Sequence, residues 1–140
     1  MHLSAYVALA GLLSFCIAAH AQVLRDYRCK IERMATAEAP PNATLEFWSK
    51  AYLGREFTVD RRTGVMAGAL KNSYMTKPEV IDFGSEGNSF KVVTTLRREQ
   101  GVGRGSNAYL LVVNEYAQGP TKPFLFVEND EVYFGTCVHF

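Results

Sequence analysis

Arginine is the residue type whose placement in this chain most directly suggests chemistry. Arg97, Arg98 and Arg104 bracket a glycine-rich stretch, and Arg61 and Arg62 stand side by side just before Gly64. A guanidinium group donates paired hydrogen bonds to a carboxylate or a phosphate, so neighbouring arginines can form an anion-binding site. If the ligand is anionic, we expect that site at Arg97, Arg98 and Arg104. The interpretation that we favour for these charges is that they keep loops and strand edges soluble and prevent edge-to-edge aggregation.

Acid–base catalysis by carboxylates would require two of them to face one pocket. Glu115 is unusual among the acidic residues because it continues the face of Tyr109, Leu111 and Val113 in an alternating run. A carboxylate on an interior face needs a polar partner. A carboxylate at the rim does not, and the rim is the position that we expect for Glu115. The other acidic candidates lie at predicted turns and strand ends: Asp60, Asp82, Glu86, Glu128, Asp130 and Glu131.

Histidine and glycine give no catalytic or nucleotide-binding pattern. His2 and His20 lie in an N-terminal leader, and His139 is the penultimate residue, where we expect a structural role. The stretch 101–105 reads G-x-G-x-G, but a dinucleotide fingerprint requires a strand before it and a helix after it. A β-prone run follows here instead. We therefore predict no catalytic residue and no cofactor, and we favour a non-enzymatic protein.

The N-terminus has the features of a secretory signal peptide. Residues 3–19 form an apolar run without charge, and Ala19-His20-Ala21 places small residues at the −3 and −1 positions of a cleavage site. We predict a signal peptide over residues 1–21 and a single domain over residues 22–140, located in the periplasm or secreted. A transmembrane anchor is the alternative, but it usually needs about 20 apolar residues, and we expect no membrane span after cleavage.

Two cysteines remain beyond the leader, which itself contains Cys16. They are Cys29 and Cys137, at the two ends of the predicted domain. In an exported protein of this size, an even pair is most simply one disulfide. Metal binding is the alternative, but it needs three or four ligands, and this domain offers one histidine and two distant cysteines. We predict a Cys29–Cys137 disulfide and no metal site.

The composition is that of one ordinary globular domain. Apolar residues make up 48% of the 140 residues and charged residues 21%, which is not the composition of a disordered chain. Lys and Arg number 15 against 14 Asp and Glu, so the formal net charge is +1. Nucleic-acid binding depends on an excess of positive charge that releases counterions. We therefore expect no nucleic-acid partner.

Alternation with a period of two and regularly spaced turns dominate residues 22–140. A short helix is predicted over Leu45 to Leu53, where Leu45, Trp48 and Tyr52 share one face. Strands are predicted at 23–33, 56–60, 65–70, 79–83, 90–97, 109–116, 124–128 and 132–138. Their connections are too short for crossovers, so neighbours should pair antiparallel. The fold is therefore predicted to be all-β, a meander of about eight strands, and a disulfide between the first and last strands favours a closed barrel.

In such a meander alternate turns lie at the same end. The turns at 61–64, 84–88 and 117–122 should share one end, and the loop at 100–107 should lie at the other. The arginines are thereby split between the two ends, so that Arg61 and Arg62 cannot join Arg97, Arg98 and Arg104 in one site.

Four segments spread over the predicted domain carry a resemblance to known proteins. They are Tyr27-Arg28-Cys29-Lys30-Ile31-Glu32, residues 54–64, Ser89-Phe90-Lys91-Val92, and the tail made of residues 122–126 with Phe134-Gly135-Thr136-Cys137. In these segments the chain resembles a family of small exported bacterial proteins of uncharacterised function. The resemblance implies export and a disulfide-closed β fold, and it implies no activity for any residue.

A second set of residues is similar to the membrane-bound inhibitors of C-type lysozyme. Those inhibitors are small periplasmic barrels with an early Tyr-x-Cys, a late Cys and a Ser-Gly motif followed by Tyr. The chain matches them at Tyr27-Arg28-Cys29 and at Cys137, whereas Gly105-Ser106 before Tyr109 has the small residues in the opposite order. This similarity implies an inhibitor-like function as one alternative.

Three classes of function stay open at this point. The first is an exported non-enzymatic module that binds an unknown protein or an anionic ligand in the cell envelope through loops at one end of the barrel. The second is a structural or accessory subunit of an envelope assembly, with exposed aromatic residues at its interface. The third is an enzyme that relies on carboxylates or arginines. Two converging carboxylates in a cavity would favour the third class.

Overall fold

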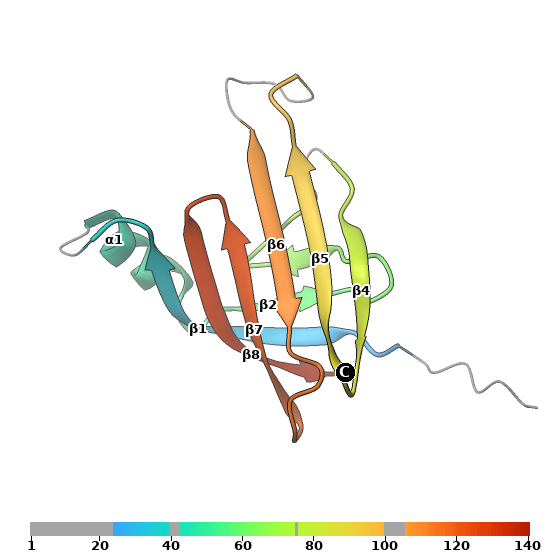
Figure 1. The fold of residues 1–140 in the computed structure, drawn as a ribbon. Coiled ribbons are helices and arrows are strands. Elements are labelled where there is room, and N and C mark those ends of the chain that lie inside the picture. Colours follow the sequence, from blue (N-terminus) through green and yellow to red (C-terminus); the bar gives the residue numbers. More distant parts are fainter. Residues whose placement is uncertain (1–23, 40–42, 75, 100–105) are drawn as a thin grey trace, which may run out of the picture.

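Eight antiparallel strands and one short helix form the fold, as the sequence predicts (Figure 1). The computed structural model of the protein describes residues 24–39, 43–74, 76–99 and 106–140. The elements are β1 (Tyr27–Thr36), α1 (Ala43–Tyr52), β2 (Glu56–Val59), β3 (Met66–Gly68), β4 (Glu79–Ser85), β5 (Asn88–Leu96), β6 (Asn107–Val113), β7 (Thr121–Glu128) and β8 (Glu131–His139). Within the described ranges, no helix is long and apolar enough to span a membrane.

The strands form one sheet in the order β3-β2-β1-β8-β7-β6-β5-β4. The predicted pairing of the first and last strands is confirmed, because β1 and β8 lie side by side and Cys29 faces Cys137. The disulfide between these two cysteines is present. The sheet curls into a half-barrel, and its edge strands β3 and β4 are not hydrogen-bonded to each other in the described part of the chain.

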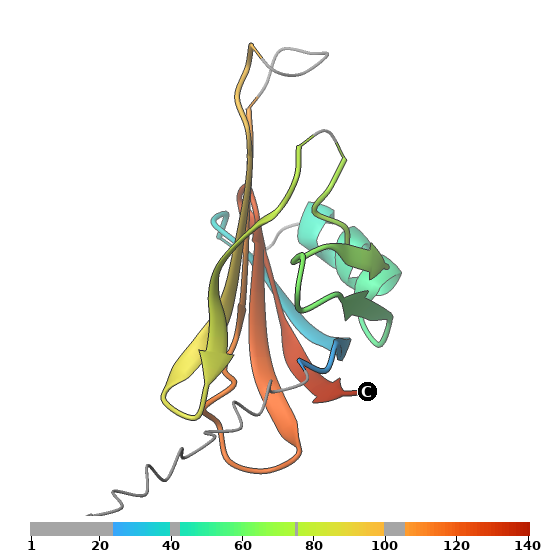
Figure 2. The same ribbon diagram turned by 90° about the vertical axis from the view of Figure 1, so that its right-hand side faces the viewer.

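The curl places the first three strands across the face of the later ones. In Figure 1, β1 and β2 run across the view behind the steeper β5 and β6. Figure 2 shows the β2–β3 hairpin and α1 on the same side of the β5–β6 strands. The turn between β2 and β3 reaches β5, because a side-chain carbon at Gly64, whose φ is +74°, would lie 2.6 Å from Cγ1 of Val92. Glycine is needed there both for its backbone angle and for this close approach.

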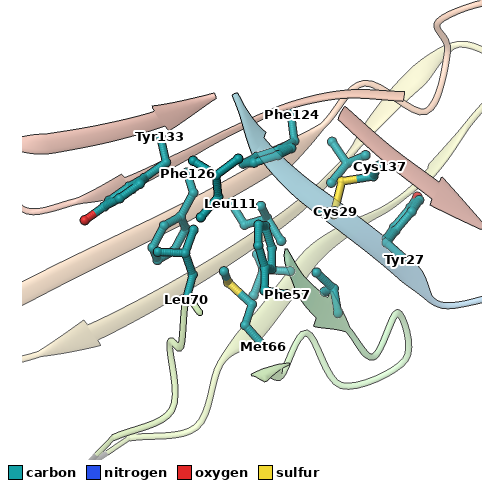
Figure 3. Close-up of a cluster of buried hydrophobic side chains, with 14 of the residues drawn as sticks. Tyr27, Cys29, Phe57, Met66, Leu70, Leu111, Phe124, Phe126, Tyr133 and Cys137 are labelled. Carbon is teal, nitrogen blue, oxygen red and sulfur yellow. A yellow bond between two sulfur atoms is a disulfide. The ribbon is translucent and has the colours of Figure 1, made fainter. Parts of the chain in front are cut away.

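The hydrophobic core fills the concave side of the half-barrel (Figure 3). Residues that alternate along each strand point into it, as the period of two predicts. The largest buried side chains are Tyr27, Phe57, Phe90, Phe126 and Tyr133. In Figure 3 the Cys29–Cys137 bond and Tyr27 lie at one end of this core, and Tyr133 and Phe126 lie toward the other.

Helix α1 is amphipathic and covers one end of the core. Leu45, Trp48 and Tyr52 are the partly buried residues that pack against the core, and they are the three residues that the sequence places on one face. The Tyr52 ring meets the Tyr133 ring edge to face at a centroid distance of 5.5 Å. The helix therefore contributes aromatic side chains to the end of the half-barrel at which Tyr133 lies.

Candidate functional site

The structure describes only part of the predicted arginine site. Arg97 and Arg98 directly follow β5 and are exposed, while Arg104 lies outside the described residues. The anion site at Arg97, Arg98 and Arg104 therefore stays a prediction. The other predicted arginine pair is divided, because Arg62 is exposed whereas Arg61 is 7% exposed.

Arg61 is bound inside the molecule and is not a surface charge. Its Nε and Nη2 donate to the Phe83 carbonyl oxygen at 3.1 and 2.7 Å, and Nη2 also approaches the Gly84 carbonyl oxygen at 3.4 Å. These bonds join the β2–β3 turn to β4. They confirm that the turns at 61–64 and 84–88 share one end of the fold, as the strand count predicts.

Glu115 lies at the centre of a partly buried polar group that we call the Glu115 cluster: Tyr27, Arg61, Glu115 and His139. The Tyr27 hydroxyl donates to Oε2 of Glu115 at 2.6 Å, and Nε2 of His139 lies 2.9 Å from Oε1. Nη1 of Arg61 lies 3.6 Å from the same Oε1. The plain rim position expected for Glu115 is therefore not what the structure shows, since its side chain is 14% exposed and has three polar partners.

The electrostatics of the Glu115 cluster follow from these contacts. Burial raises the pKa of the Glu115 carboxyl, but the Tyr27 hydrogen bond and the charges of Arg61 and His139 outweigh it, so its pKa is lowered overall. The pKa of Tyr27 is raised by burial and by its hydrogen bond to Glu115. His139 also stacks on Tyr27 with a ring-centroid distance of 4.8 Å. Each polar group in the cluster already has a partner. The cluster therefore joins β1, β8, the β2–β3 turn and the end of β6, and we interpret it as a structural contact.

A cleft of about 330 Å³ lies over this cluster. It is lined by Arg61, Glu86, Glu115, Lys122 and His139, among others. The Lys122 ammonium group donates to the Ala117 carbonyl oxygen at 2.6 Å, and Arg61 is engaged as described above. Arg61 is therefore engaged within the protein, and one donor of the Lys122 ammonium group is used as well.

The opposite end of the concave face carries a second polar group. The cross-strand partners Thr94, Tyr109, Glu128 and Glu131 form one row across β5, β6, β7 and β8. Residues directly opposite each other in a sheet point to the same face. The row is thus the polar border of the core, next to the apolar row that contains Leu111, Phe126 and Tyr133.

Tyrosines surround the two carboxylates of this row. The Tyr133 hydroxyl donates to Oε2 of Glu131 at 2.7 Å. Burial raises the pKa of Tyr109 and Tyr52, and the Glu128 charge raises both further, with Tyr74 also contributing. The pKa of Glu128 itself is raised by burial and by the nearby charge of Glu131. Unlike Glu115, Glu128 has no hydrogen-bond or ion-pair partner among the described residues.

A cleft of about 250 Å³ opens beside this row, between the segment after β3 and the strands β5 and β6. We call it the tyrosine cleft, and it is lined by Asn72, Tyr74, Thr76, Thr94, Leu96, Asn107 and Tyr109. Thr94 is 3% exposed, and its Oγ1 is the one buried side-chain oxygen or nitrogen in the described ranges without a hydrogen-bond partner. An unpaired buried hydroxyl costs about 1–3 kcal/mol. This cost marks the tyrosine cleft as the candidate functional site.

Two carboxylates lie beside the tyrosine cleft without lining it. Adjacent carboxylates with one raised pKa are a pattern found in acid–base catalysts. Glu128 and Glu131 stand in the row that adjoins the cleft, and their charge reaches it, since Glu128 raises the pKa of the lining residue Tyr109. Among the described residues no group of three His, Cys, Asp or Glu side chains could hold a metal ion.

The tyrosine cleft was not predicted from the sequence. Glu128 and Glu131 are candidates there only as separate residues at strand ends, and Thr94 and Tyr109 occupy ordinary alternating strand positions. One signal was available: Glu128 continues the alternation of the buried residues Phe124 and Phe126, which places a charge on the interior face of β7. Its partners across the sheet depend on register, which the alternation does not specify.

Comparison with known proteins identifies no relative. No protein-family model, no curated protein and no solved structure matches the chain. The resemblances to small exported bacterial proteins and to lysozyme inhibitors therefore stay predictions, and Gly105, which belongs to the second, lies outside the described residues.

Proposed function

We propose that the protein is an exported, non-enzymatic binding module that takes its ligand in the tyrosine cleft. The observation that carries this proposal is Thr94, a residue that lines the cleft and whose buried Oγ1 has no hydrogen-bond partner. Buried polar groups are almost always paired. A hydroxyl left unpaired beside a cleft is accounted for by a ligand that pairs with it when bound.

Export is supported by the disulfide. Cys29 and Cys137 are fully buried and bonded, and a structural disulfide persists in the periplasm or outside the cell, where thiols are not kept reduced. The predicted signal peptide, residues 1–21, lies outside the described residues. Its prediction and the disulfide point to the same compartment by independent arguments.

The tyrosine cleft is a better ligand site than the other two candidates. In the Glu115 cluster every charged group has a protein partner, so a ligand would have to displace existing bonds. Arg97 and Arg98 are exposed, and Arg104, the third arginine of that predicted site, lies outside the described residues. An anionic ligand there remains an open prediction.

A second candidate function is that of a subunit of an envelope assembly. On the edge strand β4, Ile81 is 54% exposed and Phe83 is 48% exposed. An edge strand with exposed apolar side chains is a surface on which another chain can pair or pack. This candidate predicts that replacing both residues by Ser abolishes association without affecting the tyrosine cleft.

A ligand screen by NMR tests the binding proposal. The disulfide-bonded protein is titrated with a panel of small polar molecules, and amide shifts of Thr94, Asn107 and Tyr109 are followed. The same panel is run on Leu96→Trp, which fills the cleft, and on Tyr116→Trp, which adds the same ring at an exposed position far from it. Binding at the cleft amides that persists in Tyr116→Trp and is lost in Leu96→Trp supports the proposal. A panel that shifts no cleft amide, or shifts them equally in both variants, overturns it.

A further inference from the structure

We propose that the ligand of the tyrosine cleft is a small organic cation, an alkylammonium group that bears at least one N–H. This inference rests on the proposed function, because it names the chemical class of ligand for the same cleft. Three features of the cleft support it: its aromatic walls, the uncompensated carboxylates in the adjoining row, and the unpaired Thr94 hydroxyl.

The aromatic walls are Tyr74 and Tyr109. Tyr109 stacks on Phe126 with a ring-centroid distance of 6.1 Å and an interplanar angle of 11°, so its ring is held in place from the core side. Tyr74 is 64% exposed and lies at the mouth. The face of a tyrosine ring attracts a cation, and the attraction is stronger where the cation is desolvated.

The carboxylates in the row beside the cleft, Glu128 and Glu131, carry negative charge and form no ion pair with a described residue. Glu128 is the direct cross-strand partner of Tyr109, and Glu131 is the partner of Glu128. No Lys or Arg within the described ranges forms an ion pair with either of them, whereas Glu115 at the other end has Arg61 and His139. The charge of Arg55 lowers the pKa of Tyr52, but burial and the charges of Glu128 and Glu131 outweigh it. A bound ammonium group would supply the missing positive charge.

The Thr94 hydroxyl distinguishes between kinds of organic cation. It faces Tyr109 across β5 and β6, and its Oγ1 can accept a hydrogen bond from an N–H of the ligand. A quaternary ammonium group has no such N–H. We therefore expect primary and secondary ammonium groups to bind more tightly than a quaternary group of similar size.

The size of the cleft and its residue types limit the ligand further. Its volume of about 250 Å³ is below the range of about 300–1,000 Å³ that is usual for drug-sized ligands, so it holds a head group or a short chain. A metal ion would require several oxygen or nitrogen ligands converging on one point. Only hydroxyl, amide and aromatic side chains line this cleft besides Leu96.

The test is a titration of the disulfide-bonded protein with three probes of similar size, followed by NMR at the Thr94 and Tyr109 amides. The probes are n-butylammonium, tetramethylammonium and n-butanol. We expect n-butylammonium to bind most tightly, and n-butanol about tenfold or more weaker, since loss of the charge interaction removes roughly 1.4 kcal/mol or more. The binding of n-butylammonium should tighten as the pH rises and Glu128 ionises, with Glu131, Tyr52, Tyr109 and Tyr133 as the other titratable groups around it.

Matched variants assign the effect to residues. Glu128→Gln should weaken both cations about tenfold, while Glu86→Gln, an exposed carboxylate at the other end, should change neither. Thr94→Val keeps the shape and should remove the preference for n-butylammonium over tetramethylammonium. An amide spectrum of each variant that matches the wild type at β1 and β8 shows that the fold is kept.

The possible results separate this inference from the proposed function. If n-butanol binds as tightly as n-butylammonium, or if Glu128→Gln changes nothing, the cation assignment is wrong, and shifted cleft amides still support a binding module. If no probe shifts the cleft amides but other polar molecules do, the ligand class alone fails. If neither these probes nor the wider panel shifts them, both proposals fail.

Discussion

The hydroxyl of Tyr27 donates a 2.6 Å hydrogen bond to Glu115, a residue 88 positions later in the chain. Tyr27 is the first residue of β1, and Glu115 follows the end of β6. In the sheet these two strands are separated by β8 and β7, so they meet only because the sheet curls. The bond thus closes the half-barrel at the end that carries the Glu115 cluster.

Replacing Tyr27 by Phe should lower the free energy of unfolding by about 1.5–3 kcal/mol, because the buried Glu115 carboxylate loses a donor while the ring packing is kept. Urea denaturation of the disulfide-bonded protein measures this. Tyr116→Phe is the control, since Tyr116 is 46% exposed and the same change should alter stability by less than about 0.5 kcal/mol. Equal effects in the two variants would show that the Tyr27 bond does not stabilise the fold.

Arg61 and Arg62 provide an adjacent matched pair. Arg61→Lys cannot keep both hydrogen bonds to the Phe83 carbonyl oxygen, and we expect a loss of about 1–3 kcal/mol. Arg62→Lys changes an exposed side chain and should cost less than about 0.5 kcal/mol. The midpoints of thermal unfolding of the two variants, compared with the wild type, test this prediction. A larger decrease for Arg62→Lys than for Arg61→Lys would contradict it.

Glu115 and Glu128 should affect the pH dependence of stability in opposite directions. The pKa of Glu115 is lowered by folding, so its contribution is present above its ordinary pKa of 4.5 and is lost as the pH falls through the folded value. The pKa of Glu128 is raised by folding, so the folded state loses stability as the pH rises from 4.5 through the raised value.

The two glutamine variants test this contrast by urea denaturation at several pH values. Glu115→Gln should reduce the loss of stability on acidification below about pH 4.5. Glu128→Gln should be more stable than the wild type at pH 7, and the difference should vanish at low pH. A destabilised Glu128→Gln at pH 7 would mean that the carboxylate has a favourable partner and would remove it from the proposed cation site.

The disulfide should contribute several kcal/mol. Cys29 and Cys137 are 108 residues apart in sequence, and a loop of about this length corresponds to about 4–5 kcal/mol in the chain-entropy model. The double variant Cys29→Ala, Cys137→Ala should lose about this amount in urea denaturation. A loss below about 1 kcal/mol, or mass analysis of the unreduced protein that finds two free thiols, would contradict the prediction.

Gly135 lies in β8 where no side chain fits. The register of β1 against β8 shifts between Ile31 and Arg33, and a side-chain carbon at Gly135 would collide with the Lys30 carbonyl oxygen and lie 2.9 Å from the Phe124 ring. Gly135→Ala should therefore cost about 3 kcal/mol in chemical denaturation. In the matched variant Gly87→Ala the nearest atom would be 4.0 Å away, so its stability should stay within about 0.5 kcal/mol of the wild type. A tolerated alanine at 135 would show that β1 and β8 can move apart there.

Local patterns in the sequence predict most of the elements of this fold. Alternation of buried and exposed residues identifies the strands, the spacing of Leu45, Trp48 and Tyr52 identifies the single helix, and the pair Cys29 and Cys137 identifies the contact between β1 and β8. These features are readable because each depends on neighbours in the chain or on one chemically distinctive pair. The number of strands and the end at which each turn lies follow from them.

The partners within the two polar groups depend on the tertiary structure. The sequence predicts Arg61 as a turn residue. It is buried and donates to backbone carbonyl oxygens of β4 because the curled sheet brings the β2–β3 turn against β4. Thr94, Tyr109, Glu128 and Glu131 form one row only through the registers of three strand pairs. Alternation assigns each residue a face but not a partner, because register and curvature are set by the packing of side chains distant in sequence. The strands, the helix and the disulfide could thus be predicted from local patterns, whereas the pairing of Glu115 and the lack of an ion-pair partner for Glu128 among the described residues depend on the curl and register of the sheet.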